Sequence, residues 1–366
     1  MDCVMQRILI NKREIKVPLM ANNDNILIQV KDLKIHFFTN EGTVQAVDGV
    51  TFDIRSGKTL CMVGESGCGK SVTARALLQI VHRPGKIVAG DIVLYRQKNQ
   101  DQAEAINISK LEPKGHVIRS IRGKEISMIF QEPMTSLSPM YTVGNQIMET
   151  IRLHTGADKK QARGRTLEML EFVGIPRPDR IIDEYPFRLS GGMRQRAMIA
   201  MALSCNPRLL IADEPTTALD VTTQAQIIDL MQSLQKDYDM GILFITHDLG
   251  VVAEIADNVA VMYLGNVVEY SDVRTIFHDP QHPYTQSLLR SIPKVTATRE
   301  KLEVIRGMVP SPFRRPSGCP FHPRCTKAMP ICSEVEPKTV SLTENHLVHC
   351  LLFDESAKKP AREMAS

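Results

Sequence analysis

The sequence predicts an α/β fold built around a buried parallel sheet, because three short apolar runs each end in polar residues. Residues 59–63 lead into a glycine-rich loop, residues 209–212 into Asp213 and Glu214, and residues 242–245 towards His247. Uniformly apolar runs of this length are typical of strands that are covered on both faces. Ligands of open α/β sheets bind beyond the carboxyl ends of the strands, so we expect these polar groups to share one crevice.

Further segments surround this predicted core. Residues 26–53 and 89–129 indicate strands of an antiparallel β layer, the second segment with polar loops such as 96–104. Residues 143–205 have a helical pattern and are expected to form a helical subdomain of a domain that spans 26–270. Ten of the 21 prolines lie between 280 and 337, which predicts a small, irregular C-terminal domain over 271–353. Residues 1–25 and 354–366 are expected to be tails, and either Met1 or Met20 to be the start.

Composition excludes several classes of protein. At 366 residues, with 43% hydrophobic and 23% charged residues, the chain has enough apolar sequence for two or three folded units. No apolar run approaches the ~20 residues of a membrane-spanning helix, and the first 25 residues lack the features of a signal peptide, so we expect a cytoplasmic protein. The net charge of +4 does not call for a nucleic-acid partner, and none is expected.

The glycine-rich loop is predicted to bind the phosphates of a nucleotide. Three glycines let the backbone wrap around an anion with its N–H groups facing inward. Lys70 is expected to reach the β- and γ-phosphates, and Ser71 to offer a hydroxyl to Mg²⁺ at the start of the next helix. The loop consists of Gly64, Glu65, Ser66, Gly67, Cys68, Gly69, Lys70 and Ser71.

Two carboxylates and a histidine complete a predicted site for ATP hydrolysis. Asp213 is expected to hold Mg²⁺ directly or through water, and Glu214 to polarise the attacking water. His247 follows the third apolar run, and its convergence on the same crevice predicts a contact with the γ-phosphate. We therefore expect an ATPase with Lys70, Glu214 and His247 as its catalytic residues.

A second anion site is predicted at residues 190–192. Ser190 precedes Gly191, Gly192 and an almost wholly apolar run, which is the pattern of a capped helix start. The N-terminus of a helix attracts anions, and the two glycines permit close approach of the backbone. A chain with two phosphate-binding elements suggests that two chains share each nucleotide.

These motifs, in this order, resemble those of ABC transporter ATPase subunits over residues 26–270. The resemblance implies a P-loop NTPase core in which ATP lies between the Walker A loop of one subunit and the signature of its partner. Residues 64–71 then form the Walker A loop, Gln131 the Q-loop, 189–193 the signature, Asp213 and Glu214 the Walker B pair, 217–220 the D-loop, and His247 the switch histidine.

The resemblance adds two site residues that no local pattern indicates. Gln131 is expected to sense Mg²⁺ or the γ-phosphate, because the Q-loop of the family lies between the nucleotide and the membrane partner. The family also places an aromatic ring against adenine. Phe37 occupies that region here, with Phe38 as the neighbouring candidate.

Within this superfamily, the chain is similar to the oligopeptide/dipeptide importer branch. The similarity rests on Tyr185-Pro186 before the signature, on Met193 at its end, and on the C-terminal run 310–325. It implies a peripheral subunit at the cytoplasmic face of the membrane, with a second homologous ATPase, two transmembrane permease subunits and an extracytoplasmic solute-binding protein as partners. Dipeptides or oligopeptides are the expected cargo, and nickel complexes, glutathione, opines or sugars are alternatives.

Four of the eight cysteines crowd the C-terminal domain. Cys319, Cys325, Cys332 and Cys350 are separated by five, six and seventeen residues, which lets four thiolates converge on Zn²⁺ or an iron–sulfur cluster. The resemblance points to a four-iron, four-sulfur cluster. Zinc is the alternative, with His322, His346 and His349 as substitute ligands, and free buried thiols are the third possibility. We expect the metal centre to fold a segment that is too rich in proline to hold itself together.

Two other functions stay open on the sequence. A soluble ABC ATPase that acts on DNA or ribosomes often carries tandem cassettes or coiled-coil inserts, and this chain has neither. A metal-sensing module that binds nucleotide without turnover would not need Glu214 and His247.

Overall fold

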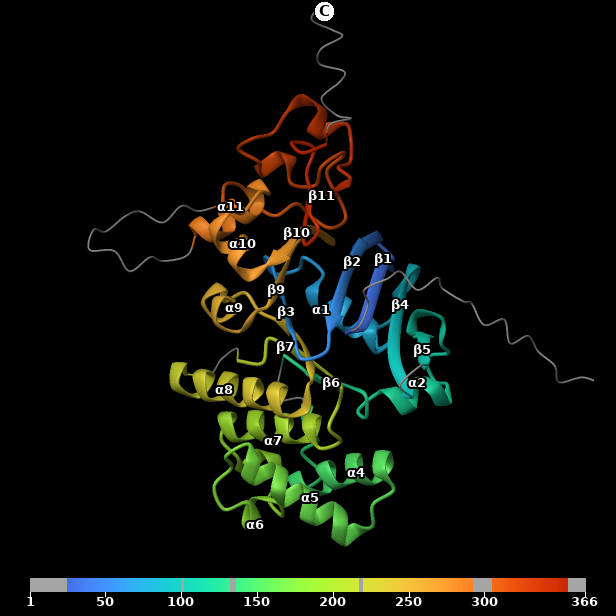
Figure 1. Ribbon diagram of the computed structural model, residues 1–366, viewed down its shortest axis with the longest axis vertical. Helices are drawn as coiled ribbons and strands as arrows, with labels where there is room; N and C mark the ends of the chain where they lie inside the picture. The colour runs from blue at the N-terminus through green and yellow to red at the C-terminus, as the bar shows by residue number, and fades with distance from the viewer. Residues whose placement is uncertain (1–24, 100–101, 132–135, 217–219, 292–304, 355–366) are drawn as a thin grey trace, which may run out of the picture.

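The computed structural model describes residues 25–99, 102–131, 136–216, 220–291 and 305–354. The expected N-terminal tail, with Met1 and Met20, lies outside the described residues, as do residues 217–219 of the expected D-loop and nearly all of the expected C-terminal tail. Along the long axis of the molecule, a group of helices lies at one end, the main sheets lie in the middle, and the C-terminal segment lies at the other end (Figure 1).

An eight-stranded sheet forms the centre of the molecule. Its strands run in the order β11 (Thr339–Thr343), β12 (His346–His349), β10 (Asn266–Asp272), β9 (Asn258–Tyr263), β3 (Thr59–Val63), β8 (Gly241–Ile245), β7 (Leu209–Asp213) and β6 (Ile126–Ile129). From β9 to β6 every neighbouring pair is parallel. The three apolar runs are thus confirmed as neighbouring parallel strands, β3, β8 and β7.

The central strands are apolar throughout because both faces of the sheet are covered. In β3, Leu60 and Met62 belong to one hydrophobic core, whereas Cys61 and Val63 belong to the other. The same alternation holds in β7 and β8, as the period of two of a strand requires. Polar groups can therefore be presented only beyond the strand ends.

A second sheet covers one face of the central sheet, on the side of α1 (Lys70–Leu77). It contains β2 (Gly42–Arg55), β1 (Ile26–Thr39), β4 (Gly85–Asn99) and β5 (Gln102–Asn107), all paired antiparallel, which confirms the predicted antiparallel layer. The polar stretch that was expected to be a loop is mostly strand, because β4 and β5 form a hairpin there. η1 (Ile108–Lys110) and α2 (His116–Ile121) follow β5.

Helices cover the other face and form the end of the molecule drawn in green in Figure 1. Thr142, Asp158 and Ser190 cap three of them, each by accepting a hydrogen bond from the backbone N–H three residues later. The helices of this half are α4 (Val143–Thr155), α5 (Lys159–Phe172), α6 (Pro178–Ile181), η2 (Pro186–Arg188), α7 (Gly191–Leu203), α8 (Val221–Tyr238) and α9 (Leu249–Ile255).

The C-terminal segment continues the central sheet. β12 pairs antiparallel with β10, and β11 pairs with β12, so this hairpin covers an edge that β10 would otherwise expose. The helices of the segment are short, and several have proline in the first turn, where it is tolerated. They are α10 (Val273–His278), α11 (Pro283–Arg290), η3 (His322–Arg324) and η4 (Pro330–Ser333).

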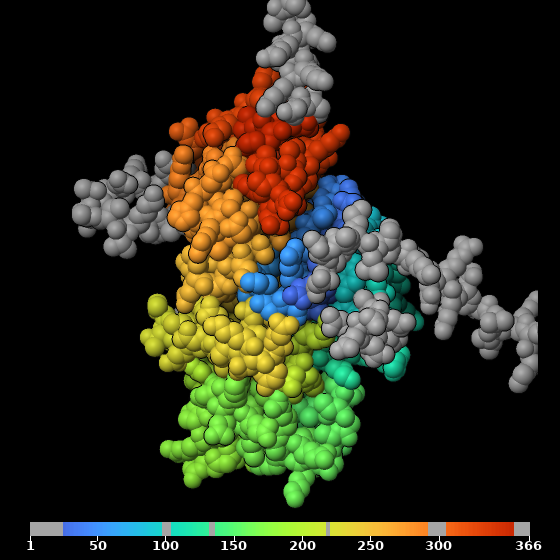
Figure 2. Space-filling view, in the orientation of Figure 1, coloured from blue at the N-terminus to red at the C-terminus, as the bar shows by residue number. Residues whose placement is uncertain are grey.

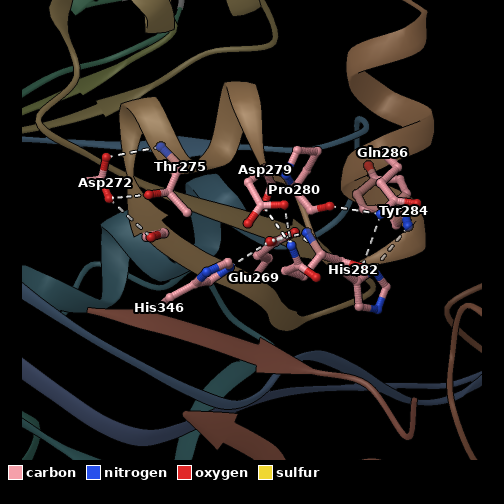
Figure 3. A network of polar contacts seen from close by, with 11 residues as sticks. Glu269, Asp272, Thr275, Asp279, Pro280, His282, Tyr284, Gln286 and His346 are labelled. Carbon is pink, nitrogen blue, oxygen red and sulfur yellow. Dashed lines mark hydrogen bonds and ion pairs between the residues drawn. The ribbon is translucent and has the colours of Figure 1, made fainter. Parts of the chain in front are cut away.

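The buried Glu269 of β10 holds α11 to the sheet (Figure 3). Its carboxylate accepts hydrogen bonds from the backbone N–H groups of Gln281 (2.7 Å) and His282 (3.0 Å), and it lies 2.9 Å from Nε2 of His346. Nδ1 of His282 in turn accepts a hydrogen bond from the backbone N–H of Tyr284 (3.0 Å) and caps α11. Burial, with a smaller effect of His349, lowers the pKa of His282 to about 3.

We predict that His282 makes the fold acid-sensitive. Between its ordinary pKa of about 6.5 and its folded value of about 3, the unfolded chain binds a proton that the folded chain does not bind. Stability is therefore complete above this interval and falls as the pH is lowered through it, by about 2 kcal/mol at a pH of about 5.

Asparagine at this position would keep a side-chain acceptor at the helix N-terminus and remove the titrating group. The thermal midpoint of His282→Asn, measured by circular dichroism from about pH 8 to about pH 5, should therefore decline less steeply than that of the wild type. Parallel declines in the two proteins would refute the assignment.

Candidate active site

The loop between β3 and α1 requires glycine at two positions. Gly64 has a φ of +149°, and a Cβ there would lie 2.2 Å from the carbonyl oxygen of Met262. Gly69, the N-cap of α1, has a φ of +104°, and its Cβ would lie 2.4 Å from the carbonyl oxygen of Ala46. The chain can follow this tight path only without side chains at these points, and such a path is what wraps a backbone around phosphate.

Lys70 is buried inside this loop. Its Nζ donates hydrogen bonds to the carbonyl oxygens of Gly64 (2.7 Å) and Glu65 (3.1 Å), and it lies 3.6 Å from Sγ of Cys68. Burial raises the pKa of the Cys68 thiol, so Cys68 is a neutral packing residue of the loop. Ser66 and Gly67 are exposed and form the open side of the loop. The positive charge thus lies at the centre of the predicted phosphate site.

Ser71 and Asp213 meet at the adjoining strand ends and fit a magnesium site. Oγ of Ser71 donates a hydrogen bond to Oδ1 of Asp213 (2.9 Å), whereas Oδ2 of Asp213 is buried without a hydrogen-bond partner among the described residues. Burial raises the pKa of Asp213. A cation would satisfy this oxygen and favour the ionised carboxylate, and a hydroxyl beside a carboxylate is the donor set that Mg²⁺ takes in such sites.

Glu214 lies between Gln131 and His247. Nε2 of Gln131 donates a hydrogen bond to Oε2 of Glu214 (3.1 Å), and Nδ1 of His247 lies 3.5 Å from Oε1. Glu214 itself has a φ of +49°, which is uncommon for a residue with a side chain and is frequent at functional sites. The structure therefore brings together the carboxylate expected to activate water and the two residues expected near the γ-phosphate.

The predicted second anion site lies at an exposed helix start. Ser190 and Gly191 are exposed at the N-terminus of α7, where Oγ of Ser190 accepts a hydrogen bond from the N–H of Met193 (3.3 Å). A Cβ on Gly192 would lie 3.6 Å from Cγ2 of Thr223 in α8. These residues thus face solvent beside α8, and their side is open to another molecule.

Glu65 has partners that the sequence did not indicate. Its carboxylate forms a two-point ion pair with Arg324, at 2.6 and 3.0 Å, and its backbone N–H donates a hydrogen bond to the hydroxyl of Tyr284 (3.0 Å). Glu65 was expected as part of the loop that binds the cofactor, and the structure also joins it to the C-terminal segment. No local pattern could have revealed Arg324 and Tyr284, because they lie 259 and 219 residues from Glu65 along the chain.

The two candidate rings for adenine differ in exposure. Phe37 is partly buried against the core between the sheets. Phe38 is 48% exposed, and Nζ of Lys86 lies 5.9 Å from its ring centroid. Phe38 is therefore the more exposed ring, whereas Phe37 packs partly against the core.

The four C-terminal cysteines lie near one another as free thiols. Cys319, Cys332 and Cys350 are buried and Cys325 is half-buried. Burial, with the charges of the neighbouring thiols, raises the pKa of Cys319 to about 11 and that of Cys350 to about 12. Among the described residues, no group of three or more histidine, cysteine or acidic side chains is arranged to hold a metal ion.

Two of the histidines considered as zinc ligands already have partners. Nε2 of His346 lies against Glu269, and Nδ1 of His322 lies 2.9 Å from the carbonyl oxygen of Cys319. These contacts occupy one ring nitrogen of each of the two histidines.

Comparison with known proteins agrees with this geometry. Residues 47–217 match the ABC transporter family, and residues 268–332 match the C-terminal region of oligopeptide/dipeptide transporters. The dimeric ABC transporter cassette MJ0796 is 26% identical, with a TM-score of 0.58 over 68% of this chain and 99% of that one. The same cassette in a post-hydrolysis state, bound to ADP and phosphate, is 27% identical and has a TM-score of 0.57.

Relatives match almost the whole chain. The oligopeptide transport ATP-binding protein AppD of Bacillus subtilis is 49% identical over 90% of this chain and 97% of its own length. The dipeptide transport ATP-binding protein DppD of Haemophilus influenzae is 48% identical over 85% of this chain and 91% of its own. Within the described ranges, no helix is both long and apolar enough to cross a bilayer. The chain belongs to the ABC transporter family, as an ATP-binding subunit and ATPase with the C-terminal region of oligopeptide/dipeptide transporters.

Proposed function

We propose that this chain is an ATPase subunit that powers the import of dipeptides or oligopeptides. The observation that carries the proposal is the match of 85–90% of the chain, including the C-terminal region, to subunits named for transport of these peptides. The subunit is expected to act at the cytoplasmic face of the membrane, against two permease subunits that receive cargo from an extracytoplasmic solute-binding protein. Cargo choice then lies with those partners.

The site residues have distinct roles in the proposed hydrolysis. Lys70 exchanges the loop carbonyls for the phosphates of ATP, and Glu214 orients and polarises the attacking water. Gln131 and His247 hold Glu214 between them until the γ-phosphate arrives, and His247 then contacts that phosphate. Ser71 and Asp213 would hold Mg²⁺, with Gln131 as a further candidate, and the ion would neutralise charge on the β- and γ-phosphate oxygens.

The exposed start of α7 supports a shared nucleotide. Ser190, Gly191 and Gly192 present a helix N-terminus to solvent, which suits the phosphates bound in a partner's Walker A loop. We infer that two such ATPase chains close on ATP, and that the partner is a second, homologous subunit. Closure and reopening of this pair would drive the permeases between their two states.

We further propose that the four C-terminal thiols hold a four-iron, four-sulfur cluster, with zinc as the alternative. The burial of Cys319, Cys332 and Cys350, and the mutual electrostatic effect of the four thiols, support this assignment. Thiolate ligands suit either centre.

Copurification tests the transport role. A tagged chain, pulled down from its native membranes in detergent, should bring along two multispanning proteins and a second ATPase that mass spectrometry identifies. A tagged, unrelated cytosolic ATPase controls for non-specific capture. Recovery of ribosomes or DNA-repair proteins in place of membrane subunits would refute the importer.

Glu214→Gln should separate ATP binding from hydrolysis. The amide keeps the size of the side chain but cannot act as a base, so we expect turnover to fall on the order of 10²- to 10⁴-fold. Nucleotide affinity should persist, because Lys70 and the loop are unchanged. Phosphate release and equilibrium binding of a labelled ATP analogue measure the two quantities.

Lys70→Ala is the contrasting variant. It removes the charge at the centre of the loop and should weaken binding itself. Normal turnover in Glu214→Gln would remove Glu214 from its assigned role.

Cys325→Ser should reduce the metal content and the stability of the C-terminal segment. Metal binding contributes to folding where the segment cannot bury enough apolar surface by itself. Metal analysis and visible absorbance distinguish iron–sulfur from zinc, and Cys205→Ser, which changes a half-buried thiol beside Thr150, is the matched control. Unchanged metal content and stability in Cys325→Ser would contradict the structural role.

A further inference from the structure

The C-terminal segment contacts the Walker A loop at Glu65 through an ion pair and a hydrogen bond. Nη1 and Nη2 of Arg324 donate hydrogen bonds to the two carboxylate oxygens of Glu65, at 2.6 and 3.0 Å. The Arg324 side chain is only 4% exposed and that of Glu65 26% exposed, so solvent screens this pair far less than a surface ion pair. The two-point geometry also fixes the orientation of the carboxylate.

Arg324 is itself held in place. Its Nε donates a hydrogen bond to the carbonyl oxygen of Arg306 (3.0 Å), and its guanidinium group lies 5.8 Å from the ring centroid of Tyr263. It ends η3, directly before Cys325. The fold of the cysteine-bearing segment therefore determines where the guanidinium group lies.

Tyr284 makes the second contact with Glu65. Its hydroxyl accepts a hydrogen bond from the backbone N–H of Glu65 (3.0 Å), and its ring packs against Tyr263 and Phe321 with centroid distances of 4.8 and 5.3 Å. The network around Glu269 and His282 anchors the start of α11, on which Tyr284 lies (Figure 3). The third polar group of Glu65, its carbonyl oxygen, accepts a hydrogen bond from Lys70. Glu65 thus joins the C-terminal segment to the lysine of the phosphate site.

We propose that Arg324 and Tyr284 are positioning residues for ATP binding, through which the C-terminal segment keeps the Walker A loop ready for phosphate. The inference rests on the proposed nucleotide site. Two effects act together. The contacts of Tyr284 and Arg324 hold the loop in one conformation, which lowers the entropic cost of binding ATP. The ion pair with Arg324 also neutralises the carboxylate of Glu65, which would otherwise repel the phosphates. A disturbance near Cys325 would then lower ATP affinity through Arg324.

The space-filling view is consistent with this link between distant parts of the chain. The C-terminal segment, drawn in red, lies directly against the N-terminal part of the described chain, drawn in blue (Figure 2). A second contact of the same interface offers a matched control. Nη1 of Arg315 binds Oδ2 of Asp48 in β2 at 2.7 Å, and the Arg315 side chain is 17% exposed.

Equilibrium binding of a fluorescent, non-hydrolysable ATP analogue with Mg²⁺ to the full chain tests the proposal. Arg324→Gln should raise the dissociation constant about tenfold or more, and Tyr284→Phe about two- to tenfold. Arg315→Gln should leave it unchanged. The deficit of Arg324→Gln should shrink at high salt and when Glu65→Gln is added, because both reduce the effect of an unpaired carboxylate.

The outcomes separate positioning from general stability. Wild-type affinity in folded Arg324→Gln and Tyr284→Phe would overturn the proposal, and so would equal losses in Arg315→Gln and Arg324→Gln. If Arg324→Gln does not fold, the dissociation constant of Tyr284→Phe alone tests the proposal. A wild-type chain that bound no analogue would overturn the nucleotide site itself, and the inference with it, whereas normal wild-type binding with unaffected variants would overturn the inference alone.

Discussion

The burial of the parallel sheet on both faces is the constraint on which the rest of the structure depends. Because β3, β7 and β8 are apolar on both faces, polar chemistry is possible only where these strands end. Asp213 marks this point on β7, opposite Ile245 of β8, and Ser71 reaches it from the adjoining helix. The sheet therefore gathers groups from sequence positions more than a hundred residues apart without a dedicated scaffold.

The site contains a buried polar atom whose missing interaction a bound cation would supply. Oδ2 of Asp213 is buried without a hydrogen-bond partner, which costs about 1 to 3 kcal/mol for a polar atom. The left-handed backbone conformation of Glu214 is a second feature that costs folding free energy. Asp213 ends β7 and Glu214 directly follows it, so the cohesion of the sheet holds both in place. The ring of His247, in contrast, is 65% exposed and is held only by its contact with Glu214 at 3.5 Å among the described residues.

Much of this could be predicted from the sequence, and the exceptions have a common cause. The strand positions, the glycine loop and the positions of Lys70 and Asp213 beyond the strand ends follow from local patterns, because period and spacing are local properties. The order of the strands and the partners of Glu65 could not be predicted in this way. An ion pair between residues 259 positions apart, for example, leaves no periodic signal in the sequence. The relative exposure of Phe37 and Phe38 could not be predicted for a related reason: which of two adjacent rings is exposed depends on the local register of β1, where the pairing with β2 shifts between Ile35 and His36.

The C-terminal segment shows how a proline-rich chain can be ordered by attachment. Its two longest strands only extend the edge of the central sheet, and its helices are one or two turns long. Three aromatic rings, the buried Glu269 and the core packing of Cys319 and Cys332 supply the remaining cohesion. These contacts also lead to the Walker A loop, because Tyr263, which packs on Tyr284 and Phe321, belongs to β9 beside β3. The contacts that order the segment are thus the same contacts that place Arg324 and Tyr284 on Glu65, so the segment cannot loosen without releasing the loop.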